Sequence, residues 1–174
     1  VVGGILGAVA AFYGGATDNI IMRCLDVLLA IPSTLLAISI AASLGPGLFN
    51  LMVAVGISSV PTYARVVRAS VLTVKGQEFV EAAKAVGASD FRMIFSHMIP
   101  NAIAPVIVQA TLGVAGAILS AAGLSFLGLG IEPPTPEWGS MLSEASEFLR
   151  RAPYLLVFPG VSILLSAMSC NLLG

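Results

Sequence analysis

The run GVAGAILSAAGLSFLGLG, residues 113–130, contains no charged side chain and consists mainly of small and aliphatic residues. It lies inside a longer interval, residues 93–131, that carries no formal charge. A helix needs about 20 apolar residues to cross the hydrocarbon core of a bilayer. The interval therefore predicts a membrane span at about 102–128, in which Pro105 falls within the first helical turn, where proline is tolerated.

Composition extends this interpretation to the whole chain. Of the 174 residues, 57% are hydrophobic and 10% are charged, and the mean hydropathy is +1.00. A soluble domain of this size carries roughly 25% charged residues. Because so few charges cannot cover a surface that faces water, the composition indicates a membrane protein. The net charge of −1 provides no basic surface for nucleic acid.

Charge-free runs predict an all-α, polytopic transmembrane helix bundle with five spans. The turn Gly45-Pro46-Gly47 divides the run between Asp26 and Arg65 into two helices. Both ends of the chain lie inside apolar runs, so we expect a fragment, truncated at both termini, of a subunit with a sixth span upstream. The expected spans are residues 1–16, 27–44, 48–64 and 102–128, and the run that follows Arg151.

The distribution of Lys and Arg predicts the orientation in the membrane. Residues 65–92 contain five of the eight basic side chains, and loops rich in Lys and Arg remain in the cytoplasm. Residues 132–151 contain four Glu and only two Arg, so we expect this loop outside. Alternation of the spans then places the turn at 45–47 outside and a loop at 17–26 inside.

Small residues and helix-bending residues recur in the expected spans. Gly, Ala and Ser allow close helix packing in lipid, and internal Pro and Gly leave backbone groups that can line a cavity. A transport domain fits these features, as does ordinary packing of kinked helices without a path. Polar residues at mid-span are the candidates to line a path: Ser39, Ser58, Ser59, Gln109, Thr111 and Ser120.

The most polar stretch is EFVEAAKAVGASDFRMIFSHMIPN, residues 78–101. Its first half has apolar residues at helical spacing, and Gly87 suits the left-handed conformation that ends a helix. Ser89 and Asp90 suit the N-terminus of a second helix. That helix has one apolar stripe, formed by Phe91, Ile94, Phe95 and Met98. The sequence predicts a cytoplasmic helix–turn–helix that lies on the bilayer, packs on the spans or docks into a partner.

The order of residues in this stretch resembles a known signature. Glu81-Ala82-Ala83, three further residues, Gly87 and then Pro100 resemble the EAA signature of ATP-binding-cassette importer permeases, the binding-protein-dependent inner-membrane components. Two positions depart from the common pattern: His97 stands where Ile is usual, and Ile99 where Leu is usual. The variant SHMIPN is similar to the branch that transports dipeptides, oligopeptides and nickel.

The similarity to this branch covers essentially the whole chain. Residues 26–33, DVLLAIPS, resemble its third span. Residues 124–130 and 133–139, LSFLGLG and PPTPEWG, resemble its external loop, and residues 171–174, NLLG, resemble its last span. The ordered set is a stronger indication than the EAA signature alone.

The resemblance implies a type I importer transmembrane domain over residues 1–174, in the plasma (inner) membrane of a prokaryote, with a cytoplasmic coupling segment at about 76–100. In this family the EAA segment docks in a cleft of an ATPase subunit and transmits nucleotide-driven closure to the spans. The implied partners are two cytosolic ATPase subunits, a homologous second permease subunit, an extracytoplasmic solute-binding protein and membrane lipid. The residues carried over to coupling are Glu81, Ala82, Ala83, Gly87, Ser89, Asp90, Phe91, Arg92, Ile94, Phe95 and Pro100.

The sequence contains no set of residues for chemistry of its own. It has no G-x-x-x-x-G-K-[ST] loop for ATP, so we expect ATP hydrolysis on separate subunits, no enzyme activity in this chain and no cofactor. Cys24 and Cys170 lack metal-ligand spacing and are interpreted as buried small hydrophobes, so no metal site is expected. The single histidine, His97, has no catalytic partner in the sequence and is expected to be structural.

Two groups outside the coupling segment carry alternative interpretations. Trp138, beside Glu137 in the external loop, is either an interfacial anchor or a contact for a binding protein. Asp18, Arg23 and Asp26 cluster at the expected inner mouth, where solvated or paired boundary charges are the simpler interpretation.

Three functions are open. A permease subunit that forms half of a translocation pathway for di- or oligopeptides explains the EAA signature, with nickel or another small solute as the alternative substrate. A secondary transporter or channel would be expected to carry charges deep in its spans or inverted repeats, and neither is visible. A membrane scaffold without transport leaves the EAA signature unexplained.

Overall fold

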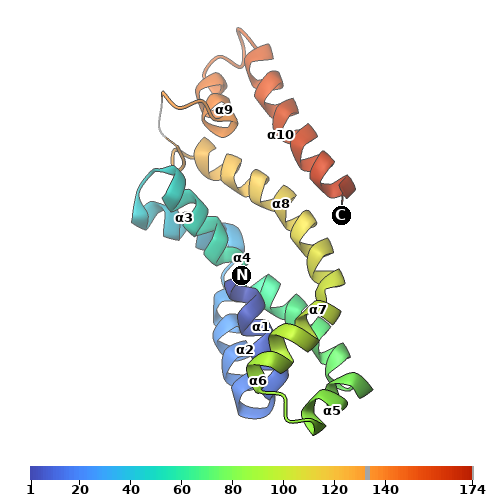
Figure 1. The fold of residues 1–174 in the computed structure, drawn as a ribbon. Helices are drawn as coiled ribbons and strands as arrows, with labels where there is room; N and C mark the ends of the chain where they lie inside the picture. The colour runs from blue at the N-terminus through green and yellow to red at the C-terminus, as the bar shows by residue number, and fades with distance from the viewer. Residues whose placement is uncertain (132–133, 174) are drawn as a thin grey trace. The chain divides into compact units, whose positions relative to one another are not determined.

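The computed structural model describes residues 1–131 and 134–173. Within these ranges the chain is helical and contains no β-strand, as expected of an all-α membrane domain (Figure 1). Glu132, Pro133 and Gly174, which the sequence similarity assigns to the external loop and the last span, lie outside the described residues. The chain forms two compact units, residues 1–31 with 59–109 (unit 1) and residues 32–58 with 110–174 (unit 2).

Unit 1 contains the coupling segment and the helices that support it. The glycines Gly14 and Gly15, with φ of 66° and 53°, end one helix and begin the next. Its helices are α1 (Val2–Tyr13), α2 (Gly15–Leu29), the C-terminal part of α4 (Leu48–Lys75), α5 (Glu78–Ala85), α6 (Asp90–Arg92), the π-helix η1 (Met93–Met98), α7 (Ile99–Asn101) and the start of α8 (Ile103–Phe126).

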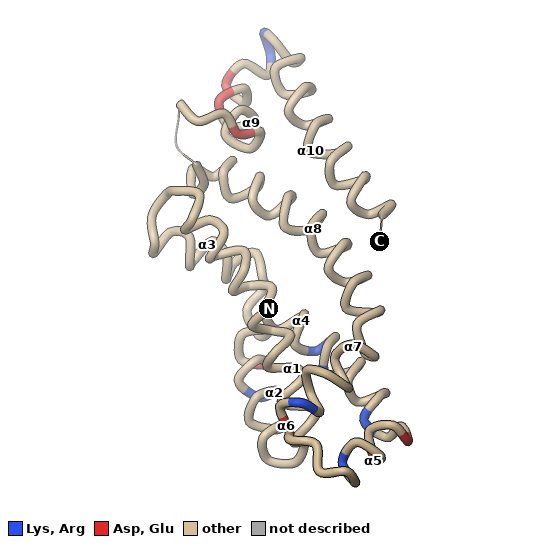
Figure 2. Tube along the Cα trace, viewed as in Figure 1, with Lys and Arg blue, Asp and Glu red and all other residues tan. Residues whose placement is uncertain are grey.

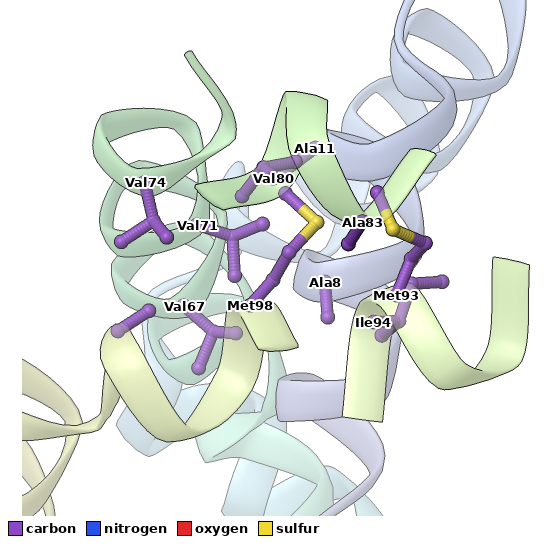
Figure 3. Packing of buried hydrophobic residues seen from close by; sticks show 11 residues of the cluster. Ala8, Ala11, Val67, Val71, Val74, Val80, Ala83, Met93, Ile94 and Met98 are labelled. Carbon is purple, nitrogen blue, oxygen red and sulfur yellow. The ribbon is translucent and has the colours of Figure 1, made fainter. Parts of the chain in front are cut away.

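The core of unit 1 joins α1, α4 and the coupling segment (Figure 3). α1 contributes small residues, and its Gly3 and Gly7 lie against the backbone of α4, where a Cβ atom would meet α4 carbonyl groups. Met98 and Val71 are fully buried in this core. The buried members are Ala8, Ala11, Val67, Val71, Val74, Val80, Ala83, Met93, Ile94, Met98 and Ala102.

Unit 2 has a separate, smaller core. It contains α3 (Ser33–Leu44), the N-terminal part of α4, the rest of α8, α9 (Trp138–Ser146) and α10 (Tyr154–Leu173). The Gly47 amide donates to the Gly130 carbonyl at 2.8 Å and ties the α3–α4 turn to the end of α8. The core consists of Ala37, Ala41, Leu51, Ala54 and Leu124.

The helix boundaries correct two expectations from the sequence. A loop was expected at 17–26, which is wrong: these residues belong to α2, whose acidic side chains are paired with Arg residues of α4. The expected helix at 27–44 is also wrong, because it breaks at Ile31–Pro32 into the end of α2 and the start of α3. Proline lacks the backbone N–H that an α-helix requires and disfavours the helical conformation of the residue before it.

The expected spans differ in how clearly they appear. In the described residues, α8 and α10 are long and apolar enough to cross a membrane, with 24 and 20 residues. α2 and α3 together form a third only if they are counted as one broken span. The other expected spans correspond to α1, which is apolar but 12 residues long, and to α4, whose 28 residues continue into a basic C-terminal part.

Candidate functional site

The coupling segment begins as a helix that ends at Gly87, as predicted. α5 stops at Ala85, and Gly87 has a φ of 80°, which residues with a Cβ rarely adopt. The Gly87 amide donates to the Lys84 carbonyl at 3.0 Å, and the Ala88 amide donates to the Ala83 carbonyl at 3.1 Å. These two bonds form a Schellman motif, which satisfies carbonyl groups at the end of α5 and turns the chain sharply.

The second helix of the segment is less regular than expected. Ser89 is its N-cap residue, but its side chain makes no capping hydrogen bond. After the single turn of α6 the chain widens into η1, in which the Ile99 amide donates to the Ile94 carbonyl. In a regular α-helix the ring of Pro100 would clash with the carbonyl of Ser96, and the wider turn of a π-helix gives that carbonyl room.

The residues of the apolar stripe that the sequence predicts differ in exposure. Ile94 and Met98 are 4% and 0% exposed and belong to the core of unit 1. Phe91 and Phe95 are 72% and 40% exposed, and their ring centroids lie 4.6 Å apart. The four residues expected to form one apolar stripe therefore lie in two different environments. One pair of residues anchors the segment to its own chain, and the other pair lies on its surface.

The coupling residues expected from the sequence divide in the same way. Ala83 and Ile94 are buried, so they support the segment from within. Val86, which the sequence did not single out, is 85% exposed at the turn. The remaining expected residues are all exposed: Glu81, Ala82, Gly87, Ser89, Asp90, Phe91, Arg92, Phe95 and Pro100.

Polar contacts attach the segment to the end of α1. The Tyr13 hydroxyl donates to the Asp90 carboxylate at 3.1 Å. Lys75, the last residue of α4, donates from Nζ to the carbonyl groups of Ala11 and Phe12 at 2.9 and 2.6 Å. The last carbonyl groups of a helix have no partner within the helix, so a cation at this position is favourable.

Two further cations of α4 pair with α2. Arg68 donates from Nε to an Asp18 carboxylate oxygen at 2.6 Å, with a second bond from its terminal nitrogen. Arg65 donates to Asp26 at 2.7 Å. Asp18 and Asp26 are therefore paired, which agrees with that part of the simpler interpretation, whereas the position of Asp18, Arg23 and Asp26 at a membrane boundary stays a prediction. Figure 2 shows the Lys and Arg positions of unit 1 on α2, α4 and the coupling segment.

Sequence reasoning missed Tyr13 as a contact of the coupling segment, and Arg68 and Lys75 as contacts of α2 and α1. One signal was available, because Arg68 and Lys75 are seven residues apart and therefore lie on one face of a helix. The pair Gly14-Gly15 also marks the end of α1, where carbonyl groups need donors. The contact itself was not predictable, because Lys75 and the carbonyl groups it binds are more than 60 positions apart in the sequence.

The candidate path residues lie in both units. The hydroxyl groups of Ser39 and Ser58 donate to carbonyls of their own helices, Leu35 at 2.8 Å and Val55 at 2.9 Å. Ser120 lines an apolar groove of about 350 Å³ between α3 and α8 in unit 2. The carbonyl of Gln109 accepts a long hydrogen bond of 3.4 Å from the hydroxyl of Tyr63. Ser59 and Thr111 are half-buried.

Glu137 and Trp138, which the sequence analysis expects in an external loop, lie at the start of α9. The Glu137 carboxylate accepts a hydrogen bond from the Ser140 amide at 2.8 Å and caps the N-terminus of α9. Trp138 follows it and is 43% exposed.

The two cysteines and the single histidine lie in different environments. Cys24 is exposed and Cys170 half-buried, so the expectation that both are buried is wrong for Cys24. His97 is half-buried, and its carbonyl accepts from the Asn101 side chain at 2.6 Å. Among residues 1–131 and 134–173, no three His, Cys, Asp or Glu side chains are grouped to hold a metal ion.

Comparison with known proteins identifies relatives over nearly the whole chain. This chain is 49% identical over 172 residues to the dipeptide transport system permease protein of Alkalihalophilus pseudofirmus. The match covers 99% of this chain and 57% of the relative. It is 48% identical over 170 residues to the di/tripeptide transport system permease protein of Pseudomonas aeruginosa, covering 98% and 56%. It is 47% identical over 163 residues to the glutathione transport system permease protein of Escherichia coli, covering 94% and 54%.

The chain spans about half the length of the curated relatives it matches. Residues 3–174 match the family model described as binding-protein-dependent transport system inner membrane component. The all-helical fold, with its apolar spans, is that of a type I ATP-binding-cassette importer membrane domain. This chain belongs to the family of binding-protein-dependent transport system inner membrane components.

Proposed function

We propose that the chain is the transmembrane part of a permease subunit in an ATP-driven importer and forms half of a translocation pathway. The observation that carries this proposal is the divided coupling segment. Its buried residues, Ile94 and Met98 among them, attach it to α1 and α4, while Phe91 and Val86 remain exposed. A surface that is apolar, exposed and rigidly supported suits docking into a groove of a partner.

The partner that fits this surface is a cytosolic ATPase subunit. These 174 residues contain no phosphate-binding loop, and we propose that energy from ATP comes from a separate protein. Phe91 can contribute roughly 1.5–3 kcal/mol if the partner buries it fully. Glu81, exposed on α5, is available to pair with a basic group. By family membership we propose two such ATPase subunits and a second, homologous permease subunit.

We propose di- or oligopeptides as the substrate, delivered by an extracytoplasmic binding protein. The names of the relatives, which refer to dipeptide, di/tripeptide and glutathione transport, support a peptide substrate. Nickel or another small solute is the alternative. The six polar mid-span residues named above are proposed to line the path. Trp138 and Glu137 are proposed to lie at the surface that meets the binding protein, with the coupling segment on the cytoplasmic side.

The test uses the full-length permease assembled with its ATPase subunits and binding protein in proteoliposomes. Glu81→Lys reverses the exposed charge, and Gly87→Pro removes the left-handed turn. Both variants are expected to insert in the membrane but to lose the ATPase subunits on purification and to lose ATP-dependent dipeptide uptake. Glu78→Lys, a charge reversal on the same helix, is the control and retains both. Normal uptake by the Glu81 and Gly87 variants contradicts the proposal.

Two further measurements separate the alternatives. Robust uptake in vesicles that lack any ATPase subunit favours a secondary transporter or channel. Mass spectrometry of the ligand that copurifies with the binding protein decides between a peptide and a nickel chelate. A ligand without a peptide bond contradicts the proposed substrate and leaves the ATP-driven mechanism intact.

A further inference from the structure

Two cations on one face of α4 hold the corner between α1 and α2. Arg68 and Lys75 are seven residues apart, which is close to two turns of an α-helix. Arg68 binds Asp18 in the first turn of α2, and Lys75 binds the last carbonyl groups of α1. These contacts lie on either side of Gly14-Gly15. We call Arg68, Lys75 and Asp18 the corner clamp.

The Arg68–Asp18 pair differs from its neighbour on the same helix. Arg68 donates hydrogen bonds to both carboxylate oxygens of Asp18, and the side chains of Arg68 and Asp18 are 33% and 15% exposed. Arg65 makes one bond to Asp26, and these side chains are 55% and 51% exposed. A two-bond guanidinium–carboxylate pair fixes orientation as well as distance, whereas an exposed single pair contributes little.

α2 has little apolar attachment that could replace this pair. Its one buried residue is Leu25, and its side-chain bonds to α4 are those of Asp18 and Asp26. Gly14 precedes it and Gly15 begins it, both with positive φ values, and glycine gives the chain freedom to change direction there. Without the clamp, the connection from α1 to α2 can bend instead of following a displacement of α4.

Lys75 also lies next to the coupling segment. It ends α4, and only Gly76 and Gln77 separate it from the start of α5. The Gln77 amide donates to the Val74 carbonyl at 3.0 Å, so this connection is itself a tight turn. A displacement of α5 therefore reaches Lys75 over a short path.

We propose that Arg68 and Lys75 are positioning residues for transport, which carry displacement of the coupling segment to the α1–α2 corner. This inference rests on the proposed function, since the displacement is the one that ATPase subunits impose. The three residues of the clamp are not among those proposed to line the path. With the clamp in place, movement of the docked segment displaces α1 and α2 together. Without it, the chain bends at Gly14-Gly15 and Gly76, and α1 and α2 do not follow.

The test measures transport and ATP hydrolysis in the same assembled complex. Arg68→Gln and Lys75→Met remove the clamp's charges while keeping side-chain length. Both variants are expected to retain copurifying ATPase subunits and ATP hydrolysis. Peptide transported per ATP is expected to fall by at least about fivefold, the lower end of typical coupling between sites. Arg65→Gln, the matched control on the same helix, keeps the ratio of the unmodified protein.

A charge-reversal rescue distinguishes positioning from folding. Asp18→Arg alone is expected to uncouple transport, and combining it with Arg68→Asp is expected to restore the ratio. An unchanged ratio in Arg68→Gln and Lys75→Met overturns the inference, even if less complex is recovered, because that result indicates a structural role alone. Lack of ATP-dependent uptake by the unmodified complex overturns the proposed function instead, and the inference with it.

Discussion

Single glycines of α1 determine how closely this helix approaches α4. A Cβ atom at Gly3 would lie 2.5 Å from the Val60 carbonyl oxygen, and one at Gly7 would clash with the backbone of Ala64. Gly4, on the same helix, has Val67 as its nearest neighbour at 3.8 Å, which is an ordinary contact. The small residues that the sequence suggested for close packing are therefore needed at particular positions and are replaceable at others.

We predict that Gly7→Ala destabilises the protein by about 1–3 kcal/mol, because overpacking forces the two helices apart. Gly4→Ala is the matched control. It gains the same helix propensity as Gly7→Ala but has room for the added methyl group, so it is expected to be neutral or slightly stabilising. Thermal unfolding of the purified full-length protein in detergent measures the difference. Equal unfolding temperatures for the two variants would show that α1 and α4 are not in backbone contact.

One capping side chain stabilises the N-terminus of the short helix α9. The first amide groups of a helix have no acceptor within the helix. In α9 one of them, the Ser140 amide, donates a hydrogen bond to the Glu137 carboxylate. We predict that Glu137→Ala costs about 0.5–2 kcal/mol locally and frays the first turn of α9. Hydrogen exchange at the Ser140 amide is expected to become faster.

Glu144→Ala is the control for this prediction, since Glu144 is an exposed residue of the same helix away from its N-terminus. Unchanged exchange at Ser140 in the Glu137 variant would mean that the cap does not hold the turn. If exchange is faster but peptide uptake is normal, the role of Glu137 is limited to the helix.

The coupling segment shows where reasoning from local sequence succeeds and where it stops. The end of α5 was predictable because the conformation that Gly87 adopts is a property of that residue. The division of the apolar stripe was not predictable, because a spacing of i, i+3, i+4 and i+7 assumes a regular α-helix. The segment before Pro100 is instead a π-helix, so the regular spacing does not hold there, and Phe91 and Phe95 are exposed.

At the scale of the whole molecule, the proposed orientation makes a prediction for labelling. In a background of Cys24→Ser and Cys170→Ser, Glu144→Cys and Lys84→Cys each place one exposed thiol, in α9 and α5. A membrane-impermeant maleimide is expected to label Glu144→Cys in intact spheroplasts. Lys84→Cys is expected to react only after permeabilisation. Labelling of Lys84→Cys from outside would contradict the orientation derived from the basic residues.

The class of protein, the apolar spans α8 and α10, the turn at Gly87 and the family signature were all predictable from the amino-acid sequence. Composition, hydrophobic runs and glycine conformations are local properties, so they can be read without knowing which helices meet. The folded structure was needed to show which residues of the segment at 76–100 are buried, and that Arg68 and Lys75 bond to either side of the α1–α2 corner. Those contacts join residues 50 to 64 positions apart, and local periodicity carries no information about such pairs.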